Sequence, residues 1–163
     1  MSALGLILVS LVSILDLRTE NMPSPIGLDE PNPYFSWQMF SPRRGACQKA
    51  YRLTVSEEAG SRVFDTGIVE SGSSLNIRYS GPPLKPCTGY RWKVAVLDET
   101  GTWSESPAAR FETGLMDSGW DGAEWIGSLI PGLSKYRASF NIDYDVTIRR
   151  AQPPCGKDGT LIP

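Results

Sequence analysis

Alternating apolar and polar residues run through much of the chain, and this pattern predicts β-strands. It is clearest at residues 90–97, YRWKVAVL, where every second residue is large and apolar. A period of two places these side chains on one face of a strand, toward a core. Weaker forms of the same pattern predict strands at residues 11–19, 34–39, 49–56, 62–69, 75–79 and 103–113.

Turn-forming residues separate the predicted strands and interrupt two of them. Glycine, proline, serine and aspartate recur about every 8–12 residues, as in all-β domains. Asp65, Thr66 and Gly67 interrupt the fourth strand, and Pro107 interrupts the seventh. No segment carries an apolar stripe across three helical turns. Seven strands without a helix predict two antiparallel sheets packed face to face.

The alternation also predicts the core. On the first strand, Val12, Ile14 and Asp16 fall on one face. Seven large residues are expected to meet in the core: Trp37, Tyr51, Leu53, Leu75, Trp92, Val94 and Phe111. Losing a buried tryptophan costs about 3–5 kcal/mol, and a whole domain is stable by only about 5–15 kcal/mol. We therefore expect Trp37→Ala or Trp92→Ala to unfold much of the protein.

Length and charge narrow the classes of function. The 163 residues suffice for one sandwich of about 100 residues, with roughly 60 left over. The formal net charge is −2. Basic pairs occur only at Arg43 with Arg44 and at Arg149 with Arg150. Because phosphate binding needs a clustered basic surface, no nucleic-acid partner is expected.

The reactive residue types exclude several chemistries. None of the 163 residues is a histidine. This sequence therefore excludes Ser-His-Asp catalysis, Cys-His catalysis and a zinc site with histidine ligands. Cys47, Cys87 and Cys155 show no Cys-x-x-Cys spacing. We therefore predict no metal site and no cofactor. Free thiols are expected, and a disulfide between Cys47 and Cys87 stays open as an alternative.

The N-terminal segment has two interpretations. Residues 3–15 are apolar except for Gly5, Ser10 and Ser13. This run is too short for a membrane span, which needs about 18 apolar residues. It fits the apolar part of a secretory signal that lacks the usual basic start, so residues 1–10 can be an atypical leader and the protein extracellular. Alternatively, residues 9–17 begin the first strand, and a cytoplasmic location stays open.

One group of motifs resembles the last two strands of a fibronectin type III module. It consists of LKPCTGYRWKV at residues 84–94, GTWS at 101–104 and FETG at 111–114. In such modules a tyrosine near the start of this strand binds upstream backbone, and Tyr90 occupies that position. Cys87 stands where the pattern would have a small residue. The resemblance implies a seven-stranded fibronectin type III or immunoglobulin-like sandwich at residues 11–114.

A second group resembles the N-terminal region of bacterial-type α-L-rhamnosidases, glycoside hydrolase family 78. It consists of LRTE at residues 17–20, PIGLD at 25–29, PYFSW at 33–37, AYRL at 50–53 and DTGIVES at 65–71. In that family a second β domain, assigned to carbohydrate binding, comes next, and catalysis lies further on in an α/α-barrel. The resemblance implies a linker at residues 115–134, an incomplete start of the second domain at 135–151 and an irregular tail at 152–163, as in a truncated product.

Acidic pairs are the candidates for hydrolytic chemistry. Glycoside hydrolysis uses two carboxylates about 5–10 Å apart. Four close pairs occur in the sequence: Asp29/Glu30, Glu57/Glu58, Asp98/Glu99 and Asp143/Asp145. They fall in turns or on opposite faces of a strand, so we interpret them as solvated turn charges. No catalytic residue is assigned.

Aromatic residues divide into two groups. Trp37, Tyr90 and Trp92 are predicted to be structural, whereas Trp103, Trp120 and Trp125 fall outside the predicted core. The second group can stack on a sugar. For Trp120 and Trp125 we favour the other interpretation, a wedge between the sandwich and the next domain.

Two hypotheses of function remain. The leading one is a non-catalytic accessory region of an α-L-rhamnosidase-like protein, inactive alone. Its partner would be the neighbouring domain of a longer enzyme or a rhamnose-containing glycan. The alternative is a free-standing fibronectin-type module that binds a protein or a glycan. Neither needs a membrane span.

Overall fold

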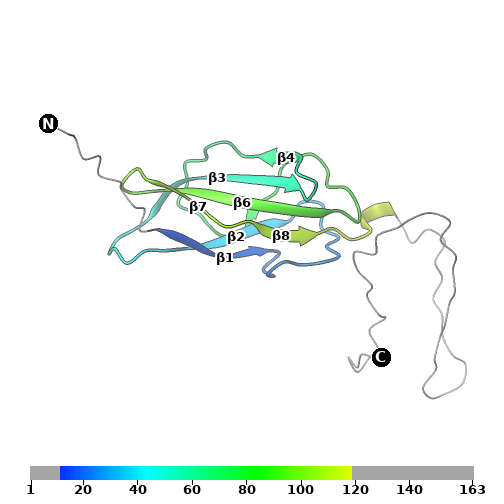
Figure 1. The fold of residues 1–163 in the computed structure, drawn as a ribbon, viewed down its shortest axis with the longest axis horizontal. Helices are drawn as coiled ribbons and strands as arrows, with labels where there is room; N and C mark the ends of the chain where they lie inside the picture. Colours follow the sequence, from blue (N-terminus) through cyan, green and yellow to red (C-terminus); the bar gives the residue numbers. More distant parts are fainter. Residues whose placement is uncertain (1–11, 119–163) are drawn as a thin grey trace, which may run out of the picture. The chain divides into compact units, whose positions relative to one another are not determined.

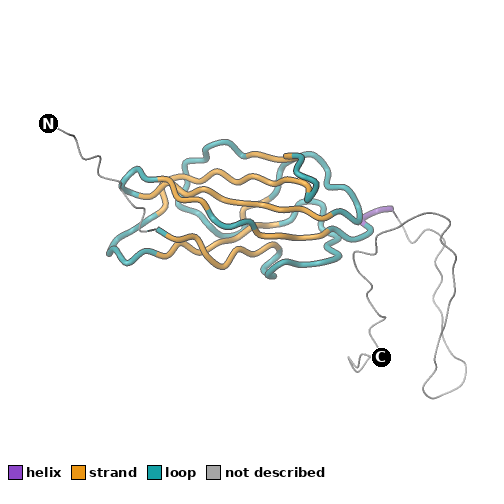
Figure 2. The backbone as a smooth tube through the Cα atoms, in the orientation of Figure 1, coloured by secondary structure: helices purple, strands orange, loops and turns teal. Residues whose placement is uncertain are grey.

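The structure, a computed structural model, describes residues 12–118 of the chain. The predicted leader, Trp120, Trp125 and the predicted second domain at residues 135–151 lie outside the described residues. Figures 1 and 2 show the described part as strands joined by loops, with one short 3-10 helix, Met116–Ser118, at its end. The prediction of an all-β fold is confirmed for this part.

The strands form two antiparallel sheets (Figure 1). The smaller sheet has the order β1-β2-β5, with β1 at Ser13–Thr19, β2 at Tyr34–Phe40 and β5 at Ile77–Arg78. The larger sheet contains β4 (Arg62–Asp65), β3 (Gln48–Glu57), β6 (Gly89–Asp98), β7 (Trp103–Glu105) and β8 (Ala109–Glu112). Because β4 pairs with β3, it joins the larger sheet and not the one that contains β1. In a constant-type immunoglobulin domain, by contrast, the sheet that contains the first strand has four strands and the other sheet has three.

The seventh predicted strand is two strands, because the chain breaks near Pro107 as expected. Both β7 and β8 pair with β6. Between them, Ser106 makes two hydrogen bonds to Val94 of β6. Its N–H donates to Val94 O at 2.8 Å, and its Oγ accepts the Val94 N–H at 3.0 Å. Pro107 has no N–H to donate, so the ladder stops there and resumes at Ala109.

The core lies between the sheets and follows the predicted alternation. The four large apolar side chains of β6 are each at most 1% exposed, while Arg91 and Lys93 face solvent. Six of the seven predicted core residues are buried: Trp37, Tyr51, Leu53, Trp92, Val94 and Phe111. The cluster includes residues from both sheets, which confirms the sandwich.

Leu75 is the exception, and its prediction as a core residue is wrong. Its side chain is 65% exposed, and β5 is shorter than predicted. The next residue, Asn76, has φ +54, so the extended alternation fails at this point. Ser36 Oγ accepts the Asn76 N–H at 3.0 Å and stabilises this turn. Tyr79, 1% exposed, contributes to the core in place of Leu75.

Asp16 does not face the core either. The register of β1 against β2 shifts between Leu15 and Arg18, and Asp16 has φ +48. This β-bulge turns Asp16 outward, where its Oδ1 accepts a hydrogen bond from Arg18 Nε at 2.9 Å. After the bulge, Thr19 is 1% exposed, so the inward set of β1 changes parity along the strand.

Two buried tryptophans have their indole N–H groups satisfied. Trp37 and Trp92 are each 1% exposed. Trp37 Nε1 donates to Gln48 Oε1 at 3.0 Å, and Trp92 Nε1 donates to Thr19 Oγ1 at 3.1 Å. The second bond joins β6 to β1, and therefore joins the two sheets through the core.

Tyr90 forms the expected tyrosine corner. Its Oη accepts the backbone N–H of Lys85 at 2.8 Å, and its ring stacks on Phe111 with centroids 5.2 Å apart. Tyr90 itself is 1% exposed. Cys47 and Cys87 are both free and exposed, so the alternative of a disulfide between them is wrong.

Candidate functional site

Trp103 is the one predicted contact tryptophan that lies among the described residues. It begins β7, opposite Leu97 of β6, and is 41% exposed. Trp120 and Trp125 lie outside the described residues. The proposal that these tryptophans contact a glycan or a neighbouring domain therefore stays a proposal.

Asp98 is a buried cap of the turn that follows β6. It is 2% exposed, so its interpretation as a solvated charge is wrong. Its Oδ1 accepts the N–H groups of Thr100 and Thr102 at 2.9 and 3.0 Å, and its Oδ2 accepts Arg43 Nη2 at 2.7 Å. Burial alone would raise the pKa of Asp98, but these hydrogen bonds and that of the Thr100 hydroxyl lower the pKa to about 2.

The other candidate carboxylates of the described part also serve local contacts. Glu57 pairs with Lys85 Nζ at 2.6 Å. Glu58 lies between Arg91 and Arg110, at 3.5 and 3.1 Å. These two arginines are directly opposite one another on β6 and β8, so Glu58 offsets their repulsion. Both carboxylates border a small groove of the sheet, where these ion pairs hold them, so neither is placed as a free acid or nucleophile.

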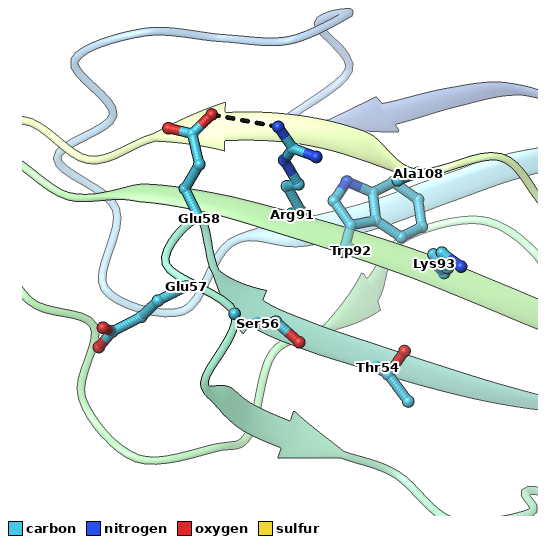
Figure 3. Close-up of a pocket in the computed structure, with 9 residues that line it drawn as sticks. Thr54, Ser56, Glu57, Glu58, Arg91, Trp92, Lys93 and Ala108 are labelled. Carbon is cyan, nitrogen blue, oxygen red and sulfur yellow. Dashed lines mark ion pairs between the residues drawn. The ribbon is translucent and has the colours of Figure 1, made fainter.

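A shallow groove lies on the outer face of β3 and β6 (Figure 3). Its volume is about 280 Å³, and Thr54, Ser56, Glu58, Arg91 and Lys93 contribute to its lining. Ligand pockets usually measure about 300–1,000 Å³ and offer apolar or aromatic walls. Trp92 also borders the groove, but at 1% exposure it offers no stacking surface. The groove is thus a small, solvent-facing hollow of the sheet without an exposed aromatic ring.

The point where the chain leaves the sandwich is held by two loops. We call this feature the exit junction, and it comprises residues 25–29, 85–88 and 112–116. On one side, the Leu28 N–H donates to Glu112 O and the Gly114 N–H donates to Leu28 O, both at 2.9 Å. On the other side, the Cys87 N–H donates to Gly114 O at 2.8 Å. The departing strand is therefore hydrogen-bonded on both edges.

Thr113 ties the second loop more closely to the exit junction. It is 2% exposed. Its Oγ1 accepts the Thr88 N–H at 2.9 Å and donates to Lys85 O at 2.6 Å. A threonine hydroxyl can donate one bond while accepting another, so it satisfies two backbone groups of the same loop.

Asp29 adds a side-chain contact at the first loop. Its Oδ1 accepts the Met116 N–H at 2.8 Å. A Cβ added at Gly114 would collide with the Asp29 carboxylate and would lie 3.0 Å from Gly27 O. Glycine at position 114 therefore allows the close approach of this loop. Asp29 belongs to the PIGLD motif and Gly114 to the FETG motif, one from each of the two resemblances, and the fold brings these motifs together.

The exit junction contains two strained residues. Met116 has φ +50 and Cys87 has φ +48, a region that residues with a Cβ rarely adopt. Such conformations persist only where the surrounding structure imposes them. Here both residues donate their N–H groups to the opposing segment, Met116 to Asp29 and Cys87 to Gly114. The sequence showed a departure from the pattern at Cys87 but did not indicate the contact of Asp29 with Met116.

Neither a cluster of metal-ligating side chains nor a membrane-spanning helix is present in residues 12–118. In that part of the chain, no group of three or more aspartate, glutamate, cysteine or histidine side chains lies close enough to hold a metal ion. The same residues contain no helix that is long and apolar enough to cross a membrane.

The two-sheet fold and the exit junction define an immunoglobulin-like β-sandwich domain whose C-terminal strand is anchored on both edges. Residues 14–117 match the family described as the Rha78A-like, N-terminal immunoglobulin domain, and the chain belongs to that family. The resemblance found in the sequence motifs is thus confirmed.

Curated relatives and solved structures agree with this assignment. The chain is 38% identical over 128 residues to an α-L-rhamnosidase of Streptomyces avermitilis, and 35% identical over 113 residues to one of Formosa agariphila. These matches cover 76% and 63% of this chain and 12% of each relative.

The crystal structure of the Streptomyces avermitilis enzyme complexed with L-rhamnose aligns with a TM-score of 0.67 and 39% identity, over 72% of this chain and 12% of that one. The structure of α-L-rhamnosidase from Dictyoglumus thermophilum aligns with a TM-score of 0.60 and 37% identity, over 67% of this chain and 13% of that one. The chain therefore spans about one eighth of the length of the relatives it matches.

Proposed function

We propose that this chain acts as the N-terminal accessory domain of an α-L-rhamnosidase-type enzyme. It performs no hydrolysis itself. It supports and orients the module that follows residue 118, and that module is its principal partner. The exit junction carries the proposal, because a strand that is hydrogen-bonded on both edges can transmit a defined direction to the chain beyond it.

The positions of the carboxylates support the non-catalytic part of the proposal. Glycosidase chemistry needs two carboxyl groups facing one sugar ring. In the described part of the chain, Asp98 caps a turn, Glu57 and Glu58 pair with basic residues, and Asp29 binds the exit segment. Each therefore serves a local structural contact, and the two that border the groove, Glu57 and Glu58, are paired with basic side chains.

A domain exchange tests the supporting role. Residues 14–117 of this chain would replace the matching domain in the Streptomyces avermitilis α-L-rhamnosidase, and a deletion of that domain would serve as the control. We expect the exchanged enzyme to keep its melting temperature within a few degrees and most of its turnover of an aryl α-L-rhamnoside, and the deletion to lose both. A deletion that behaves like the intact enzyme would overturn the proposal, as would an exchange as damaging as the deletion.

A second candidate function is binding of a glycan or a protein by the sandwich itself. The exposed ring of Trp103 is the observation that favours it, since exposed aromatic rings can stack on sugars. A glycan array would compare the chain with its Trp103→Ala variant and with a Trp120→Ala, Trp125→Ala double variant. Binding of a rhamnose-containing glycan that either variant abolishes would support this second function.

A further inference from the structure

Asp29 binds the backbone of the departing chain at the exit junction through its side chain. It comes from the loop at residues 25–29, and the residue it binds, Met116, lies 87 positions further along the chain. The bond is 2.8 Å long and joins a carboxylate oxygen to a backbone N–H at an exposed position of the domain. Its acceptor therefore connects the first loop to the last described turn of the chain.

The backbone at Met116 makes this contact consequential. Met116 has φ +50, which the chain would leave if nothing held it there. It also begins the short helix Met116–Ser118 that ends the described part (Figure 1). A change of φ at this residue alters the direction of the chain directly after it, because rotation about the N–Cα bond reorients the next peptide plane.

Gly114 is matched to the same contact. A side chain at position 114 would occupy the space of the Asp29 carboxylate. Gly114 does not have a positive φ. Its role is therefore to leave room for the Asp29 carboxylate and not to adopt an unusual backbone conformation. Asp29, Gly114 and Met116 thus form one unit, which we call the latch.

We propose that Asp29 is a positioning residue: through the Met116 amide it fixes the direction in which the chain leaves the sandwich. The inference rests on the proposed accessory role and names the contact that sets the orientation. The carboxylate acts as the hydrogen-bond acceptor of the Met116 amide, and its negative charge is not needed to hold that amide.

Two substitutions separate the acceptor from the charge. Asp29→Asn keeps an oxygen at the Oδ1 position and should keep the latch, whereas Asp29→Ala removes it. Glu30→Ala is the matched control, because Glu30 is the next carboxylate in the same loop and its Oε1 accepts the Asn32 N–H at 3.0 Å, away from the exit.

Amide hydrogen exchange measures the bond directly in the full 163-residue chain. The readout is the exchange rate of the Met116 amide divided by that of Val96, which lies in the middle of β6 and reports global opening. Asp29→Ala should raise this ratio at least tenfold, while Asp29→Asn and Glu30→Ala should leave it within about threefold of the parent. An unchanged ratio in Asp29→Ala would overturn the proposal.

A distance distribution measures the direction. Nitroxides would be attached at the exposed Cys47 and at a Ser118→Cys substitution, with Cys87 and Cys155 replaced by serine in every variant. The distribution should be narrow for the parent and for Asp29→Asn, and at least twice as broad for Asp29→Ala. Equal widths in all variants, or an Asp29→Asn distribution as broad as that of Asp29→Ala, would contradict the latch.

These measurements use this chain alone and no rhamnoside. The latch can therefore fail while the domain exchange succeeds, in which case the domain supports its neighbour by other contacts. Conversely, an intact latch with a failed exchange would show that a fixed exit does not serve a rhamnosidase.

Discussion

Trp92 and Thr19 join the two sheets through the middle of the core. The indole Nε1 of Trp92 on β6 donates to Thr19 Oγ1 on β1 at 3.1 Å, and each residue is 1% exposed. A buried donor that loses its acceptor keeps the full cost of having left water, whereas the bond itself contributes only about 1 kcal/mol. The threonine hydroxyl is therefore more important than its size suggests.

Thr19→Val tests this relationship, because valine keeps the shape and removes the acceptor. We expect a loss of about 1–3 kcal/mol in the free energy of unfolding, from the unsatisfied indole N–H. Urea denaturation followed by tryptophan fluorescence measures it. Thr19→Ser is the control and should retain most of the stability. A valine variant as stable as the parent would contradict the importance assigned to this hydrogen bond.

Tyr90→Phe tests the tyrosine corner. The substitution keeps the ring on Phe111 and removes the acceptor of the Lys85 N–H. We expect a loss of about 1 kcal/mol, measured by thermal or urea denaturation. Tyr51→Phe is the matched control, since Tyr51 is also in the core and edge-on to Trp37. Equal losses at the two positions would contradict a specific role for the Tyr90 hydroxyl.

Cys87→Gly tests the strain at the exit junction. Glycine adopts φ +48 without the steric cost that a Cβ adds, and it keeps the N–H that binds Gly114. We expect the variant to be more stable by up to about 1 kcal/mol, after the greater flexibility of glycine in the unfolded chain is counted. Cys47→Gly, at an exposed cysteine without positive φ, should instead be neutral or destabilising. The opposite order would mean that the junction does not strain Cys87.

The pKa of Asp98 predicts how stability depends on pH. Folding lowers this pKa from its ordinary value of 3.8 to about 2, so the folded state binds the proton more weakly than the unfolded state does. The contribution is therefore complete above about pH 4 and is lost as the pH falls toward 2. It is on the order of 2 kcal/mol.

The comparison with Asp98→Asn isolates this contribution. The asparagine variant should be less stable than the parent at pH 6, and the difference should shrink between about pH 4 and pH 2. Urea midpoints at several pH values measure it. A difference that stays constant over this range would contradict the pKa assigned to Asp98.

Period-two alternation predicted most of the sandwich because one face of each long strand is buried. It succeeded at β6 and β3, where the register pairs Leu53 with Val94 and Val55 with Trp92. It failed at Asp16 and Leu75, where a bulge and a left-handed Asn76 change which face a side chain takes. Such local conformations leave little trace in hydrophobicity.

The sequence indicated the motifs that form the exit junction but not the contacts between them. PIGLD and FETG were recognised as motifs, but nothing in either run indicates that Asp29 binds Met116 or that Gly114 leaves space for it. That relationship depends on a contact across 87 positions of the chain, which only the assembled sheets create. Asp98 was misjudged for a similar reason, since its partner Arg43 comes from the turn after β2.

We propose that this chain supports catalysis elsewhere and performs none itself. The most direct measurement is the release of the aryl group from an aryl α-L-rhamnoside by the purified 163-residue chain, beside a full-length α-L-rhamnosidase at the same molar concentration. We expect release no faster than the buffer blank. Clear turnover that follows the amount of this chain, and persists through further purification, would contradict it.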